Sequence, residues 1–494
     1  MSHRTAKTLR FRPEGLGLSI YSQTVQIVYS SGIVSSLALH GRSQMAARTT
    51  LNRFVEACPL VVMSRVILDA VINEDLDAVF DEHRQRGYHR QLLYSHLTRT
   101  IAQVVLGVCK TPNQAFNKLA ETIAVSKTAF YEKLKRVEPD VCRASVQYSY
   151  QRCLQMMSLL KTKRRTILSG YRCRMIDGNH LEGCDNRLKE LRKTWARALP
   201  GTAVVIHDPQ WNLVEDIFLI PNAHAQERTI FTDILETVER KDLIVADSHY
   251  CTIGFLTGIS ARNACFVIRQ HGSLKGTLVS TRKSRGRTKT GQVYEQQLII
   301  DQATGATVRR ITVELDQPTQ SGDTEIHILT NLPERKASAA RVAEIYLLRH
   351  EIEHVFYLST TTLTCEVKGL NYPMAALFLF CTAMIAINCR FVLFAALAAA
   401  HGRAVCETIS HHSAAQEICE GCDGLHIAIP DDEWQSLLPK AAAARTDFLI
   451  EVAQHLNLRR HTKTVRGPKK PPPRKTPFKN GTHVAVQKIL DERN

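Results

Sequence analysis

The chain has 494 residues, and its 64 Lys and Arg outnumber its 47 Asp and Glu, which gives a formal net charge of +17 at pH 7. This length excludes a single ordinary core, so we expect about three domains with tails. The charge favours a polyanionic partner, either nucleic acid or an anionic membrane. The 14 cysteines form no even framework, which indicates reduced thiols and excludes a disulfide scaffold.

Residues 1–50 form a leader rich in Ser and Arg, in which Glu14 is the single acid before Met45. This composition is typical of an organellar targeting peptide, or of an upstream stretch translated from a misplaced start with Met45 as the working initiator. We favour the second interpretation and expect the leader to be disordered.

Residues 51–168 carry a helical period with almost no strand-like alternation, which predicts a helical domain. Within it, residues 119–134 resemble a helix-turn-helix, with Val125 filling the turn and Ser126 capping the second helix. Gly is usual in the turn where Ala124 stands, so a plain helical hairpin is the alternative. The side chains that the second helix would present to DNA are Lys127, Thr128, Tyr131 and Lys135.

From Tyr171 onward, short β-rich runs alternate with helix-period stretches, which predicts a mixed sheet flanked by helices in a domain at 169–400. The fold class is therefore α/β. Strand signals without a helical period predict an all-β insertion at 272–332. The strands predicted before this insertion are 172–176, 202–207, 213–220, 243–246 and 264–269.

Two acids stand at the ends of predicted strands. Asp177 follows the run that ends at Ile176, and Asp247 follows the run that ends at Ala246. If the strands are neighbours, the two carboxylates converge, and they would repel unless a cation neutralised them. Oxygen ligands of this kind suit magnesium or manganese. Taken alone, each Asp could equally cap a turn.

A long amphipathic helix predicted over 338–358 supplies a third acid. Tyr346, Arg349 and Glu353 are spaced by three and four residues and therefore share one face of that helix. The alternative is an exposed Arg349–Glu353 salt bridge at i,i+4.

Basic residues follow the first Asp and are candidate phosphate contacts, with a solvated basic face as the alternative. These residues are Arg187, Lys189, Arg192 and Lys193.

An apolar stretch runs from Met374 to Ala400 and is interrupted by Arg390. A charge near mid-bilayer disfavours a membrane span, so we expect a buried core helix. A helical segment at 401–456 contains His411, His412, Cys419, Cys422 and His426, in which a Cys-x-x-Cys beside histidines could hold zinc. The spacing fits no zinc-finger pattern, so we favour ordinary helix and loop residues. Residues 457–494 form a basic, Pro-rich tail that we expect to be disordered, as a phosphate-contacting arm or a purely solvating one.

Taken together, these motifs resemble a known family. Asp177-Gly178-Asn179, then a strand-terminal Asp247, then Tyr346-x-x-Arg349-x-x-x-Glu353 are similar to the DDE transposases of bacterial insertion sequences with the Y-R-E-K signature. The resemblance runs from about residue 51 to the tail. It includes the segments His224-Ala225-Gln226-Glu227-Arg228, Ile268-Arg269-Gln270-His271 and Leu370-Asn371-Tyr372-Pro373.

The resemblance implies a ribonuclease-H-like catalytic core with a β insertion between the second Asp and the Glu. It implies that Asp177, Asp247 and Glu353 hold two Mg²⁺ or Mn²⁺ ions, and that Tyr346 and Arg349 grip DNA phosphates. The implied partners are double-stranded DNA, as terminal inverted repeats and target, and a second copy of the chain in a synaptic dimer, with no membrane. The implied location is the bacterial cytoplasm, at the nucleoid.

The chain departs from the family pattern at two positions. Thr360 stands where the signature has Lys, and Ser248 stands where an Arg often follows the second Asp. The function that the resemblance implies is cut-and-paste transposition, by metal-dependent DNA cleavage and strand transfer at the ends of an insertion sequence. The alternatives are a metal-dependent nuclease without strand transfer, and a catalytically inactive DNA-binding relic of a transposase.

Overall fold

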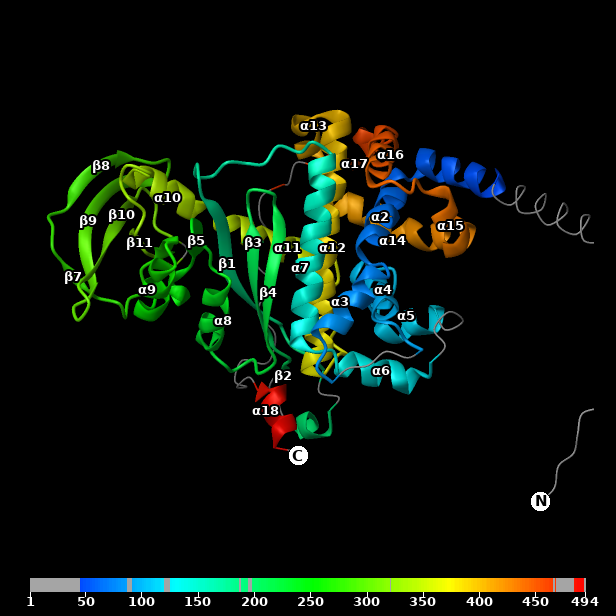
Figure 1. The fold of residues 1–494 in the computed structure, drawn as a ribbon, viewed down its shortest axis with the longest axis horizontal. Coiled ribbons are helices and arrows are strands. Elements are labelled where there is room, and N and C mark those ends of the chain that lie inside the picture. The colour runs from blue at the N-terminus through cyan, green and yellow to red at the C-terminus, as the bar shows by residue number, and fades with distance from the viewer. Residues whose placement is uncertain are drawn as a thin grey trace, which may run out of the picture.

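The computed structural model describes residues 45–86, 91–119, 125–185, 188–193, 198–319, 321–464, 467 and 484–492. A mixed sheet runs through the molecule, with helices on both of its faces and a helical body beside it (Figure 1). The expected α/β fold class is therefore confirmed.

The described part of the main sheet has ten strands in the order β4-β3-β1-β5-β6-β11-β10-β9-β7, with β8 paired to β9. β3 pairs antiparallel with β1 and β4, whereas β5 pairs parallel with β1 and β6. The strands are β1 (Arg172–His180), β3 (Thr202–Asp208), β4 (Leu213–Ile220), β5 (Asp242–Ala246), β6 (Cys265–Arg269), β7 (Thr277–Leu278), β8 (Lys283–Arg287), β9 (Gly291–Asp301), β10 (Ala306–Leu315) and β11 (Glu325–Thr330).

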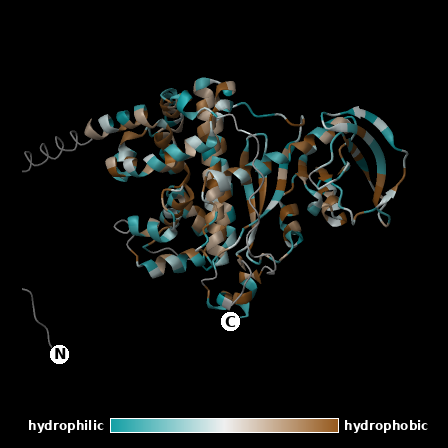
Figure 2. Ribbon diagram, turned by 180° about the vertical axis from the view of Figure 1, so that it is seen from behind, coloured by the Kyte–Doolittle hydropathy of each residue, from teal (hydrophilic) through white to brown (hydrophobic). Residues whose placement is uncertain are grey.

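The central strands are apolar on both faces because both faces are covered. Met175 of β1 packs into the core shared with the large helical body, while Ile176 faces the opposite core. That second core is completed by η2 (Glu227–Ile230), α8 (Phe231–Glu236) and α9 (Ile253–Ala261). Figure 2 shows the apolar residues concentrated on these strands and on the helices against them. Continuous apolar runs such as 243–246 follow from this two-sided burial.

The expected insertion region holds five strands, β7 to β11, and no helix among the described residues of 272–332. These strands do not form a separate sheet. β11 pairs antiparallel with β6 through Ile328↔Arg269, so the insertion extends the main sheet.

Helix α12 (Pro373–His401) is the core helix of the molecule and packs against β4 and against helices from both ends of the chain. Among the described residues it is the one helix long and apolar enough to cross a membrane by length and composition, and its most apolar window is completely buried. This burial agrees with the expected core helix.

The helical body combines two regions that we expected to be separate, 51–168 and 401–456. α14 packs on α2, and α16 packs on α2, α7 and α12. The helices before the sheet are α2 (Pro59–Val71), α3 (Asp75–His83), α4 (Tyr94–Val105), α5 (Pro112–Lys118), α6 (Lys127–Lys135) and α7 (Pro139–Leu159). Those after α12 are α13 (Arg403–Thr408), α14 (His411–Ala428), α15 (Asp431–Leu437), α16 (Ala442–Gln454) and α17 (Leu458–His461).

Both ends of the chain differ from the expectation where they are described. Residues 45–50, assigned to a disordered leader, are part of a helix that continues to residue 57, whereas the rest of the leader lies outside the described residues. The tail is not uniformly unstructured either. β12 (Val484–Ala485) pairs parallel with β2 (Ala198–Leu199), and α18 (Val486–Asp491) follows it. Apolar burial explains this docking, because Val486 packs fully buried against Leu188 and Leu191.

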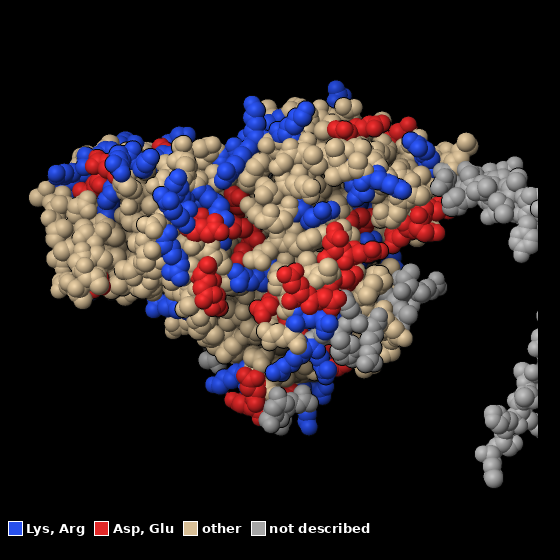
Figure 3. Space-filling model, viewed as in Figure 1, with Lys and Arg blue, Asp and Glu red and all other residues tan. Residues whose placement is uncertain are grey.

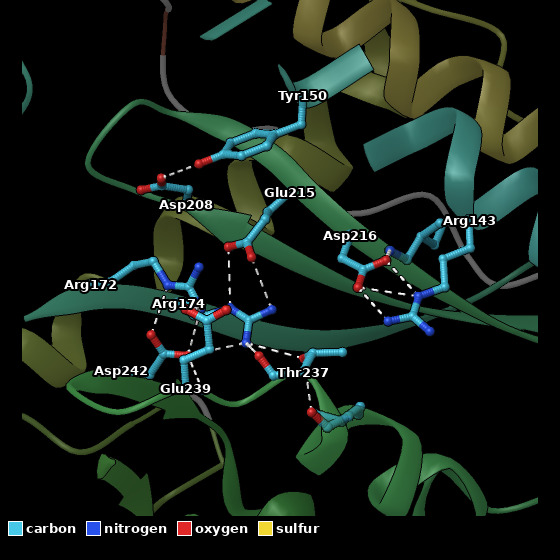
Figure 4. Close-up of polar contacts among 12 residues, drawn as sticks. Arg143, Tyr150, Arg172, Arg174, Asp208, Glu215, Asp216, Thr237, Glu239 and Asp242 are labelled. Carbon is cyan, nitrogen blue, oxygen red and sulfur yellow. Dashed lines mark hydrogen bonds and ion pairs between the residues drawn. The ribbon is translucent and has the colours of Figure 1, made fainter. Parts of the chain in front are cut away.

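An ion-pair network links β1 to β5 and, across β3, to β4 (Figure 4). Arg172 Nε lies 2.7 Å from Asp242 Oδ1 of β5, and Arg174 Nη2 lies 3.0 Å from Glu215 Oε1 of β4. Arg174 also donates to the backbone carbonyl of Thr237. Removing one partner of the buried Arg174–Glu215 pair would cost about 3–5 kcal/mol, because it leaves a charge unpaired in the interior.

Candidate active site

Asp177 and Asp247 occupy adjacent positions on two neighbouring strands, Asp177 within β1 and Asp247 directly after β5. The parallel register of β1 and β5 ends at Ile176↔Ala246, and the two acids are the next residues along the chain. Their side chains are mostly buried, with relative exposures of 19% for Asp177 and 22% for Asp247. The two strands are neighbours, as the prediction required. The prediction that the first strand ends before Asp177 is wrong, because β1 continues to His180 and stays paired with β3.

Asp247 is held by the turn that follows it. Its carboxylate accepts a hydrogen bond from the His249 backbone N–H at 2.8 Å, and the His249 ring Nδ1 lies 3.0 Å from the other oxygen. The acid thereby caps the short helix η3 (Ser248–Tyr250). Ser248, the departure from the family pattern, is the first residue of that helix.

The predicted single helix over 338–358 is wrong at one point. The structure has α10 (Ala339–Leu347) and α11 (His350–Thr361), separated at Leu348 and Arg349. The Arg349 N–H donates to Tyr346 and the Glu351 N–H to Leu348, each three residues back, so the backbone tightens there. The tighter backbone lies at Arg349, whose side chain contacts Asp177 and Glu353.

The Arg349 side chain bridges Asp177 of β1 and Glu353 of α11. Its Nη1 donates to Asp177 Oδ2 at 3.1 Å, and its Nη2 donates to Glu353 Oε1 at 2.5 Å. His350 Nδ1 lies 2.8 Å from the other oxygen of Glu353. The predicted Arg349–Glu353 pair exists, but the guanidinium is mostly buried and is not a surface salt bridge.

Tyr346 is buried beside the same guanidinium. Burial raises the pKa of its hydroxyl, while the charges of Arg349 and Arg269 lower it. Tyr346 and Arg349 therefore both face the carboxylates in this structure, and neither presents its polar group to open solvent.

Burial raises the pKa of Asp177 to about 7. The charge of Arg349 and the Gly178 N–H lower this pKa, and the charges of Asp247 and Glu227 raise it. Burial also raises the pKa of Glu353, but His350 and Arg349 outweigh it and the net shift is downward. Burial, more than the neighbouring acids, therefore sets the raised pKa of Asp177.

Glu227 is a fourth acid at this site, and sequence reasoning assigned it no role. Its carboxylate accepts a hydrogen bond from Tyr250 Oη at 2.8 Å, and His180 Nε2 lies 3.9 Å from it. It also lies against Gly178, where an added Cβ would come within 2.3 Å of Glu227 Oε1. Glu227 thus contacts both the segment that follows Asp177 and the segment that follows Asp247. The sequence signal for Glu227 was its place in the His224–Arg228 segment of the family resemblance. The spacing of that segment alone indicated no contact between Glu227 and the two aspartates.

The donor chemistry of the site fits hard divalent cations, because carboxylate oxygens are its available ligands. As the described side chains stand, however, no three His, Cys, Asp or Glu residues are gathered to hold an ion. Arg349 separates Asp177 from Glu353 by bonding to both. A shared cation would therefore require the guanidinium to move aside.

The other predicted DNA-contacting residues belong to the α6 region and to the segment after β1. Ser126 caps α6 by accepting from the Ala129 N–H, as predicted, and Lys127 is exposed at its start. Tyr131 is half-buried, with its ring 5.4 Å from that of Phe130. The first helix of the proposed motif falls mostly on residues 120–124, outside the described residues.

Arg192 is exposed on η1 (Lys189–Lys193), whereas Arg187 lies outside the described residues. The Cys and His residues considered for zinc all lie along the single helix α14, where His411 stacks on Phe394.

Residues 168–389 match the model of the transposase DDE domain family. This range contains Asp177, Asp247 and Glu353. No curated protein matches the chain. A solved structure, a piggyBac transposase synaptic complex with hairpin DNA, is similar over 82% of this chain and 87% of its own, at 10% identity and a TM-score of 0.40, too weak a likeness to show a shared fold. The range 168–389, which contains the three acids, is therefore similar to the transposase DDE domain family.

Proposed function

We propose that the chain cuts and joins DNA at the ends of a bacterial insertion sequence, with Asp177, Asp247 and Glu353 as the metal-binding acids. The observation that carries the proposal is the arrangement of these residues within the range that matches the transposase DDE domain. Two of them occupy adjacent positions on the paired strands β1 and β5, and the third is joined to Asp177 through Arg349. The strand order β4-β3-β1-β5-β6 supports a ribonuclease-H-like core.

Two Mg²⁺ or Mn²⁺ ions held by these carboxylates would supply Lewis-acid chemistry for in-line displacement at phosphorus. The protein's own part is to hold the acids in register through β1 and β5 and to exclude water by burial. Once released from Asp177 and Glu353, Arg349 is placed to contact a scissile phosphate, because its guanidinium can bind phosphate through two nitrogens. Tyr346 lies beside it and would support the same contact.

The partners that this proposal requires are the terminal inverted repeats, a target DNA and a second copy of the chain, which would hold the two ends together. Its place of action would be the bacterial cytoplasm, at the nucleoid.

The test uses duplex DNA carrying the inverted repeats that flank the coding region, with Mn²⁺ and the full chain. Cleavage at the repeat and joining to a target plasmid are expected, and Asp177→Asn and Glu353→Gln should abolish both while DNA binding persists. Asp233→Asn and Glu344→Gln are matched controls, since these exposed acids lie on neighbouring helices outside the site. Cleavage that survives both active-site substitutions would refute the assignment, and cleavage without joining would reduce the function to that of a nuclease.

A further inference from the structure

A cleft of about 690 Å³ lies beside the candidate active site. Its walls are the loop from α7 to β1, the turn between β3 and β4, and helices α11 and α12. Four cationic side chains line it together with one carboxylate, Glu351, which is paired with Arg165 at 2.5 Å. The cations are Lys161, Lys163, Arg165 and Arg403. Figure 3 shows Lys and Arg gathered over the α7–β1 loop.

The cleft is continuous with the acids through α11. His350 lines the cleft and also lies 2.8 Å from Glu353. Glu351 and His354, the next cleft residues on this helix, are within one turn of Glu353. A polymer lying in the cleft would therefore reach the candidate catalytic residues without leaving the surface.

The two lysines of the loop carry unneutralised charge. Both are exposed, and neither ammonium group is in an ion pair within the described part of the chain. The loop is nevertheless fixed, because the Arg165 N–H donates to the Gln210 carbonyl at 2.9 Å and Arg164 Nη2 donates to the Gln210 side chain at 2.8 Å. A loop whose backbone is already held loses less freedom when its lysines bind an anion.

The floor of the cleft is apolar where α12 and the β3–β4 turn meet. Ala395, Ala398 and Trp211 line it there. A cationic rim over an apolar floor complements a polynucleotide strand, whose phosphates would meet the lysines while its sugars lie on the small side chains.

We propose that this α7–β1 cleft binds the phosphate backbone of the DNA on which the acids act. The proposal rests on the proposed function and adds where the DNA lies. Contacts of this kind fix the position of a duplex and carry no sequence information. Lys161 and Lys163 are positioning residues for the substrate, outside the catalytic set.

The test measures binding of the full chain to a fluorescein-labelled random-sequence duplex of about four helical turns, over a series of salt concentrations in Ca²⁺. The double substitution Lys161→Glu/Lys163→Glu should weaken binding about tenfold at low salt and lower the slope of log K against log salt by about 2. Lys161→Gln/Lys163→Gln should lower the slope similarly with a smaller loss of affinity. Lys336→Glu/Lys440→Glu is the control, because it reverses the same charge at exposed positions outside the cleft.

Thermal unfolding of each variant checks that it is folded, and the neutral variant serves if the charge-reversed one is not. Equal affinity and salt slope for the wild type and both cleft variants would overturn the cleft assignment while leaving the catalytic assignment standing. A wild type that binds no DNA would overturn both. Loss of binding in the control pair alone would place the DNA elsewhere and would also overturn the cleft assignment.

Discussion

Arg349, in the turn between α10 and α11, donates a 3.1 Å hydrogen bond to Asp177 of β1. The same guanidinium donates to Glu353 at 2.5 Å, so one cation contacts two acids that belong to different elements. Without it, two carboxylates would face each other in a largely buried site, which disfavours the folded state. Arg349 thus occupies the place between the acids that a divalent cation would take.

This relationship predicts the behaviour of Arg349→Met. In EDTA the variant should lose about 1–3 kcal/mol of unfolding free energy, because the acids lose their counter-charge. Added Mn²⁺ should raise its melting temperature more than that of the wild type, since the ion no longer competes with the guanidinium. Differential scanning fluorimetry measures both, with Arg341→Met on α10 as the control. An Mn²⁺-induced shift equal to that of the wild type would contradict this account.

Gly178 is predicted to accept an added methyl group only if the Glu227 carboxylate moves. An added Cβ would lie 2.3 Å from Glu227 Oε1 and 2.5 Å from its Cδ. Gly178→Ala should therefore destabilise the fold by about 1–3 kcal/mol and displace the segment after Asp177. Gly254→Ala is the control, since nothing lies within 4 Å of its Cβ position.

The same contact predicts coupling between the two positions. The stability cost of Gly178→Ala should be smaller in a Glu227→Ala background, with a coupling energy of about 0.5–3 kcal/mol in urea denaturation. Additive costs would show that the two residues do not touch.

The raised pKa of Asp177 predicts a pH-dependent stability. In the folded state the Asp177 carboxyl keeps its proton up to about pH 7. In the unfolded chain, with the ordinary Asp pKa of 3.8, the same carboxyl has already lost its proton at that pH. The unfolding free energy should therefore fall as pH rises from about 4 to about 7, and this contribution should level off above that. Asp177→Asn lacks the titrating carboxyl. Urea denaturation in EDTA should therefore show that the wild type loses stability relative to this variant between about pH 5 and about pH 8. A pH-independent difference between the two proteins would disprove the assigned pKa.

The C-terminal segment is predicted to protect the loop after β1. Val486 is fully buried against Leu188 and Leu191. Val486→Asp should undock α18 and speed trypsin cleavage after Lys189 and Arg192 several-fold, because a buried charge is costly. Lys488→Ala on the same helix is exposed and should leave the rate unchanged. Equal digestion of Val486→Asp and wild type would show that the docking is not maintained in solution.

Much of the local structure could be predicted from the sequence. Apolar runs predicted the strands at Asp177 and Asp247, although β1 continues past Asp177 to His180, and the Ser126 cap predicted the start of α6. These signals are local in the chain. The helical spacing of Arg349 and Glu353 predicted their contact for the same reason, although the break between α10 and α11 was missed.

Only the tertiary structure decided which distant groups meet. The parallel pairing of β1 with β5 placed Asp177 beside Asp247, and the approach of η2 placed Glu227 against Gly178. Docking of the last helix and pairing of the inserted strands with β6 were likewise invisible in the sequence. Such contacts depend on burial and pairing between segments far apart in the chain, and one sequence records what each segment favours but not which surface will cover it.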